Sequence, residues 1–97
     1  MDSFTLFVVL RPERPLDDAA VDGLGSLLRP ADDDLRIWRE EGRGLLRVST
    51  ECVAEDLDAA LELGHALGAE ALAACRGTLL EVSALGDEDS LVWRSVP

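Results

Sequence analysis

A nearly unbroken apolar run covers residues 4–10 and ends before an Arg-Pro pair. Such a run is typical of a strand that is covered on both faces. After it, residues 20–28 repeat apolar side chains at helical spacing, with Asp17 as a candidate N-cap and Pro30 as a stop. The first third of the chain therefore predicts a central strand followed by a helix.

Two shorter segments, residues 35–40 and 45–50, flank a Glu-Gly-Arg-Gly sequence of the kind found in tight hairpin turns. A turn at Gly42 and Arg43 sets the register in which the two segments pair. In this register one face of the hairpin is mostly apolar and the other is mixed. A shift by one residue would scramble both faces, which supports this register. The predicted pairs are Arg39 with Leu46, Ile37 with Val48, Leu35 with Thr50, Trp38 with Arg47, Arg36 with Ser49 and Glu40 with Leu45.

Residues 53–76 have a strongly helical pattern, and Gly77 follows as a candidate C-cap. The centre of the apolar stripe is unusually small, since it contains Ala60, Gly64, Gly68 and Ala71. An interior glycine costs a helix about 1 kcal/mol relative to alanine. Two of them therefore indicate that the helix backbone approaches a neighbour closely, and we expect this neighbour to be the sheet or the first helix.

The C-terminal part predicts two more strands. Residues 78–85 alternate, with Leu80, Val82 and Ala84 on one face, and residues 91–96 follow after the acidic turn 86–90. The turn is short enough for the two strands to form a hairpin. We therefore expect an additional C-terminal strand beside the fourth.

The order strand, helix, strand, strand, helix, strand resembles the ferredoxin-like superfold, an α+β two-layer sandwich, and the resemblance covers almost the whole chain. We expect one domain over residues 1–97. The resemblance implies the sheet order 4-1-3-2, with both helices on one face and the first strand in the centre. The uncovered face would then carry Phe7, Val9, Trp38, Leu45 and Leu79, with Arg36, Arg47, Glu40 and Glu81 among them.

The same topology sorts the charged loops between two ends of the molecule. The expected acidic pole contains Asp32, Asp33, Asp34, Asp87, Glu88 and Asp89, with Glu51 and Glu55 nearby. The expected basic pole contains Arg11, Arg14, Arg43 and Arg76. We therefore expect a strongly dipolar molecule.

Charge limits the choice of partner, because 20 acidic residues against 9 basic ones give a net charge of -11. This balance repels phosphate backbones and argues against nucleic acid. A basic protein partner is compatible with it. No segment has the length of a membrane span or the pattern of a signal peptide, so we expect a cytoplasmic protein without membrane contact.

Few residues suggest catalysis or metal binding. His65 is the only histidine, and the chain has no P-loop, GxSxG, HExxH or GxGxxG motif. Cys52 and Cys75 lack zinc-binding spacing, and their places at opposite ends of the second helix predict that they form no disulfide. We expect no catalytic residue, cofactor or metal.

Three functional classes remain open. The first is a non-catalytic interaction or regulatory module that forms a homodimer through the uncovered sheet face and senses a small ligand, as ACT-type domains do. The second is an acidic inhibitor, immunity protein or antitoxin that binds a basic protein. The third is an enzyme or ligand carrier of the dimeric α+β barrel type. The sequence favours the first class and a protein that is not an enzyme.

Overall fold

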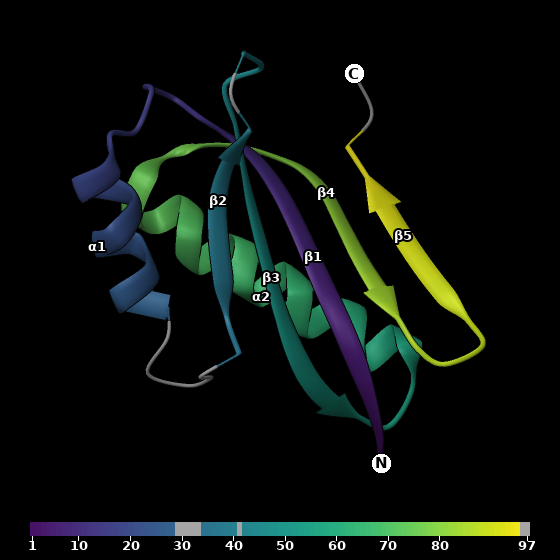
Figure 1. Cartoon of the computed structure of the whole chain (residues 1–97). Coiled ribbons are helices and arrows are strands. Elements are labelled where there is room, and N and C mark those ends of the chain that lie inside the picture. The colour runs from purple at the N-terminus through teal and green to yellow at the C-terminus, as the bar shows by residue number, and fades with distance from the viewer. Residues whose placement is uncertain (29–33, 41, 96–97) are drawn as a thin grey trace.

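A computed structural model describes residues 1–28, 34–40 and 42–95 (Figure 1). Its elements follow the predicted order of strands and helices, and the additional C-terminal strand is present. They are β1 (Asp2–Pro12), α1 (Asp18–Leu28), β2 (Arg36–Glu40), β3 (Leu45–Ala54), α2 (Leu57–Cys75), β4 (Gly77–Leu85) and β5 (Ser90–Arg94).

The strands form one antiparallel sheet in the order β2-β3-β1-β4-β5. The apolar strand β1 is central, as its composition predicts. Both helices cover the same face, since Leu24 of α1 and Ala71 of α2 share one core with Val8 and Val48 of the sheet. Figure 1 shows α2 crossing behind the sheet and α1 beside β2. The opposite face, called the open sheet face below, has no helix on it.

The β2–β3 hairpin has the predicted register. Five of the six expected pairs are present, from Arg36 opposite Ser49 to Glu40 opposite Leu45. Gly42 and Gly44 of the turn have φ angles of 82° and 66°, which side chains rarely tolerate. The turn glycines and the two-residue alternation therefore act together to fix the pairing.

The boundary between β3 and α2 differs from the prediction. The strand continues to Ala54, and the helix begins at Leu57 rather than at residue 53. The strand is longer because β1 begins at Asp2, opposite Ala54, and offers a pairing partner along this whole stretch. Asp56 is the N-cap of α2, where its carboxylate accepts a hydrogen bond of 2.8 Å from the Ala59 backbone N–H.

The small-residue stripe of α2 lies against the sheet, as predicted. The buried residues of the helix are Ala60, Gly64, Gly68 and Ala71. A Cβ atom at Gly64 would lie 2.6 Å from Val82 Cγ1, and one at Gly68 would lie 2.9 Å from Leu79 Cδ1. The glycines therefore let the helix backbone approach the sheet.

The end of α2 lies one residue earlier than predicted. Arg76 rather than Gly77 is the C-cap, with a φ of 56°, and its N–H binds the Leu72 carbonyl. Gly77 instead begins β4, where an added Cβ would lie 2.1 Å from the Arg11 carbonyl oxygen. Its lack of a side chain allows β4 to start against the end of β1.

An irregularity in β4 changes which of its residues face the helices. Val9 is opposite Glu81 while Leu10 is opposite Leu79, so β4 has one extra residue, Leu80, in this interval. Val82 and Ala84 face the core as predicted. Leu79, and not Leu80, packs in the same core cluster as Val82, so placing Leu79 on the open sheet face was wrong.

Candidate functional site

Strand pairing arranges the side chains of the open sheet face in rows that run from β2 to β5. One row contains Trp38, Arg47, Val9, Glu81 and Arg94, and the next contains Arg36, Ser49, Phe7, Ser83 and Val92. Of the nine residues predicted for this face, all except Leu79 lie on it. The sequence reasoning missed Val92 and Arg94, although extension of the two-residue alternation into β5 identifies them.

The middle of this face is apolar, and its side chains have little exposed surface although no helix lies over them. Val9 and Leu45 are each only 5% exposed, and Phe7 is partly buried. Towards the two edges of the sheet, Trp38 is 41% exposed and Val92 is 47% exposed. The face therefore offers an apolar strip whose ends are accessible.

Ion pairs flank the apolar strip. Arg47 Nε lies 2.7 Å from a carboxylate oxygen of Glu40, and Arg94 Nε lies 2.7 Å from one of Glu81. The hydrogen bond from Arg47 is the main cause that lowers the pKa of Glu40; desolvation opposes it, and Arg43 adds to the lowering. Arg47 and Glu81 are the cross-strand neighbours of Val9, so these ion pairs hold long side chains beside Val9, which is only 5% exposed.

The charge of this face differs from that of the whole chain. Its paired positions carry four arginines and three glutamates, namely Arg11, Arg36, Arg47, Arg94, Glu40, Glu51 and Glu81. The face is therefore close to neutral, whereas the chain has a net charge of -11. The excess of carboxylates lies elsewhere.

Part of that excess forms an acidic groove of ≈ 560 Å³ at one end of the molecule. Figure 1 shows the N-terminus, the β3–α2 connection and the β4–β5 turn at this end. The acidic residues that line the groove are Asp2, Glu55, Asp56, Asp58, Asp87, Glu88 and Asp89. Among the described residues, no three acidic, histidine or cysteine side chains are arranged to hold a metal ion.

The predicted acidic pole is thus only partly assembled. The β4–β5 turn and Glu55 come together, joined by Asp2, which the sequence reasoning did not include. Asp34 precedes β2, on the opposite side of the sheet from β5, and does not line the groove. Glu51 lies on β3, where it accepts a hydrogen bond from Thr5. Asp32 and Asp33 lie outside the described residues.

The predicted basic residues belong to segments at one end of the molecule, opposite the N-terminus, but they do not share one hollow (Figure 1). Arg11 and Arg76 line a shared hollow at the end of α2 together with Glu13. Arg43 lies in the β2–β3 turn and pairs with Glu40 at 3.1 Å. Arg14 is exposed in the β1–α1 connection and lines none of the hollows described for this end.

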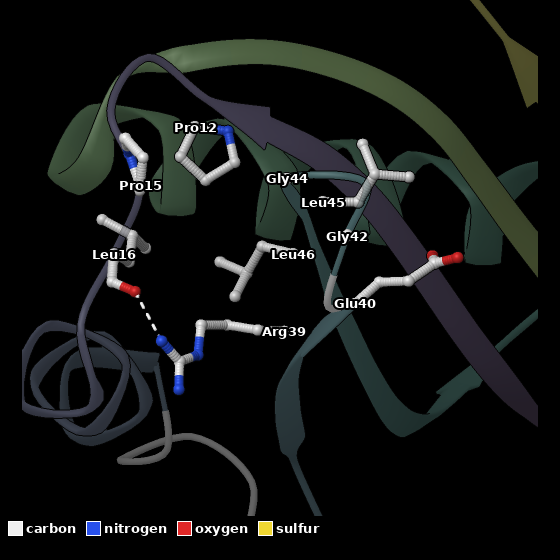
Figure 2. Close-up of a pocket in the computed structure, with 9 residues that line it drawn as sticks. All are labelled: Pro12, Pro15, Leu16, Arg39, Glu40, Gly42, Gly44, Leu45 and Leu46. Carbon is white, nitrogen blue, oxygen red and sulfur yellow. Dashed lines mark hydrogen bonds between the residues drawn. The ribbon is translucent and has the colours of Figure 1, made fainter.

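A small apolar pocket lies between the β1–α1 connection and the β2–β3 turn (Figure 2). Its volume is ≈ 220 Å³, below the roughly 300–1,000 Å³ typical of drug-sized ligand sites. Arg39 beside it donates a 2.9 Å hydrogen bond to the Leu16 carbonyl and pairs with Asp18. The residues that line it are Pro12, Pro15, Leu16, Arg39, Glu40, Gly42, Gly44, Leu45 and Leu46.

The histidine and the cysteines have structural surroundings. His65 makes an edge-on contact with Trp93 of β5, with ring centroids 4.8 Å apart. Cys52 and Cys75 form no disulfide, as predicted, and both are partly buried. Cys52 lies on β3, however, and not at the start of α2 as the prediction assumed. Burial raises the pKa of the Cys75 thiol, which disfavours the reactive thiolate at neutral pH.

Comparison with known proteins adds no functional assignment. No protein-family model matches the chain, and no curated protein matches it in sequence. Within the described residues, no helix is long and apolar enough to cross a membrane.

Proposed function

We propose that this chain is a non-catalytic interaction module that self-associates through its open sheet face. The observation that carries the proposal is the nearly neutral charge of this face on a strongly acidic chain, around an apolar centre of Phe7, Val9 and Leu45. Two like-charged molecules approach most easily through a surface where their net charge is absent. The parts of the strip that are still exposed, above all Trp38 and Val92, would then gain stability from burial.

Self-complementarity follows from the mixture of signs on the face. A two-fold axis brings each residue opposite a different one of the second copy, so arginines of one copy can meet glutamates of the other. Trp38 is the natural anchor, because it is large and 41% exposed, and aromatic residues are enriched at such contacts.

The finer fold assignment, ferredoxin-like with an added strand, is part of this proposal. It is supported by the element order and by the central position of β1. A regulatory role with a small ligand, of the ACT type, is supported by the apolar pocket beside Leu16 and Leu46.

A second candidate function is favoured by the acidic groove. Seven carboxylates around a volume of ≈ 560 Å³ form a surface complementary to an arginine- or lysine-rich segment of another protein. Under this alternative the chain is an inhibitor, immunity protein or antitoxin with a basic partner. Its binding would weaken steeply with salt, whereas association through the neutral sheet face would not.

The main proposal is tested by replacing the exposed aromatic anchor. Trp38→Glu places a charge on the apolar strip, so we expect light scattering to give a smaller assembly than that of the wild type. The matched control is Leu63→Glu, at a residue of α2 that is 46% exposed and lies outside the sheet. Its assembly should equal that of the wild type. A wild-type protein that is monomeric at tens of micromolar would falsify the proposal.

A further inference from the structure

The outer edge of β5 is the second feature of the molecule suited to a partner. In the described part of the chain β5 is the last strand on its side of the sheet. The other outer strand, β2, has α1 beside it, and its Arg39 bonds to the Leu16 carbonyl just before that helix. Edges without such cover pair readily with further strands, and β5 contains no proline.

Two hydrogen bonds establish which backbone groups of β5 point outward. Gly86 N donates to Asp89 O at 2.8 Å, and Ser95 N donates to Leu80 O at 3.0 Å. In an antiparallel hairpin, residue pairs that exchange backbone hydrogen bonds alternate with pairs that do not. The pairs Gly86–Asp89 and Leu80–Ser95 are of the first kind, so every second residue between Asp89 and Ser95 is also bonded to β4. The N–H and C=O groups of Leu91 and Trp93 therefore point towards β4, and those of Ser90, Val92 and Arg94 point towards the free edge.

We infer that β5 pairs antiparallel with β5 of a second copy, with Val92 opposite the partner's Val92. In this register the outward groups of Ser90 meet those of the partner's Arg94, so all three outward-facing residues of β5 find partners. A register centred on Trp93 would place Ser90 beyond the end of the partner's β5. The central register therefore satisfies the most backbone groups.

The side chains agree with this register. Val92 and the partner's Val92 lie side by side on the open sheet face, and Leu91 lies opposite the partner's Trp93 on the helix-covered face. Pairs of aromatic and aliphatic residues of this kind stabilise neighbouring strands. Val92 is 47% exposed in the single chain, and pairing would cover it.

The antiparallel direction also keeps the acidic turns of the two copies apart. The acidic turn 87–89 of each copy comes to lie near the C-terminal end of the partner's β5. Six residues of strand, about 20 Å, then separate the two Asp89 residues. This exceeds the Debye length of about 10 Å at 0.1 M ionic strength, so the repulsion between the turns is largely screened. Arg94 meanwhile comes to lie near the partner's Asp89.

The edge contact is compatible with the face contact proposed above. A two-fold axis through Val92 runs perpendicular to the sheet, so both open sheet faces of the joined pair point in the same direction. Two such pairs can stack face to face and form a closed assembly of four chains. The edge contact depends on the outward backbone groups of β5 and the face contact on Trp38 at the other side of the sheet, so each can be removed separately.

Amide hydrogen exchange of the wild-type protein tests the edge contact directly. The outward N–H groups of Ser90, Val92 and Arg94 should exchange fast in dilute protein and slowly at high concentration, because the partner covers them. The inward N–H groups of Leu91 and Trp93 are the internal control, since they are bonded to β4 in either state. Fast exchange at the three outward positions at every concentration would overturn the inference.

Variants of Val92 provide the second readout. Val92→Pro removes only an outward N–H, so the β4–β5 hairpin loses no hydrogen bond. Light scattering should then give half the wild-type mass, and protected Leu91 and Trp93 amides would show that the hairpin remains. Val92→Thr keeps the N–H and should retain the wild-type mass. An unchanged mass for Val92→Pro would overturn the edge contact alone, whereas an unchanged mass for Trp38→Glu would overturn the face contact alone.

Discussion

The glycines of α2 show how single residues set the distance between the two layers. Gly64 faces the fully buried Val82, and Gly68 faces Leu79 and Val8. The two contacts differ in how easily they yield. The Cγ atom of a β-branched valine is close to its backbone and has little freedom, whereas the Cδ atom of Leu79 is the end of a longer side chain.

Alanine substitutions at three helical glycines should therefore separate packing from helix propensity. Gly64→Ala gains about 1 kcal/mol in propensity but overpacks by about 1–3 kcal/mol, so we expect a net loss of stability. Gly68→Ala should be nearly neutral. Gly23→Ala on α1 is the control, because nothing lies within 4 Å of its added Cβ, and it should be stabilising. Urea unfolding measures all three, and a more stable Gly64→Ala variant would contradict the close packing.

At the scale of elements, the N-cap of α2 is the clearest local determinant of where a helix starts. Asp56 has an extended backbone and accepts a hydrogen bond from the Ala59 N–H. Asp56 also lines the acidic groove, so neighbouring carboxylates repel its charge, whereas the helix dipole attracts that charge and the capping oxygen accepts a hydrogen bond. The contributions of the charge and of the capping oxygen can be measured separately.

The cap is tested by comparing Asp56→Ala with Asp56→Asn. Asparagine keeps the capping oxygen but removes the charge, whereas alanine removes both. We expect the Ala variant to be less stable than the Asn variant by about 0.5–2 kcal/mol in thermal or urea unfolding. Asp58→Ala, in the first turn but without the capping role, provides a control for charge. Equal stability of the two Asp56 variants would show that the cap contributes nothing.

Elements were predictable from the sequence where two local signals agreed. The β2–β3 hairpin had turn glycines and a clean alternation, and its register is as predicted. The β3–α2 boundary was not predictable, because Cys52, Val53 and Ala54 fit either a strand or a helix. Only the pairing of Ala54 with Asp2, distant in sequence, selects the strand. The extra residue Leu80 depends likewise on how β4 passes β1, which no local pattern records.

On the scale of the whole molecule, the open sheet face was largely predictable and the charged poles were predictable only in part. Residue alternation, the hairpin register and the implied sheet order together assign Phe7, Val9 and Trp38 to one face. Predicting the two charged poles, in contrast, requires the positions of the loops relative to one another, and these depend on the tertiary structure. The β4–β5 turn and the start of α2 meet, whereas Asp34 lies across the sheet, and the arginines share one end of the molecule without sharing one hollow.

The acidic groove makes one prediction about the whole molecule, namely that its stability depends on salt. Seven carboxylates are closer together in the groove than in the unfolded chain, so their repulsion disfavours the folded state. Sodium chloride screens charges over about 10 Å at 0.1 M and should raise the melting temperature. Magnesium at matched ionic strength should have the same effect, whereas a saturable gain at low millimolar magnesium would indicate a bound ion instead.

Charge-matched variants distinguish crowding in the groove from the overall excess of negative charge. Asp87→Asn, Glu88→Gln and Asp89→Asn together remove three charges from the groove. Asp22→Asn, Glu62→Gln and Glu70→Gln remove three from helix positions that do not line it. We expect the first triple variant to melt higher than the second at low salt and to respond less to added salt. The melts need one protein concentration throughout, because association also raises the melting temperature. Equal behaviour of the two triple variants would mean that net charge alone, and not the convergence of the β4–β5 turn with α2, controls the effect of salt.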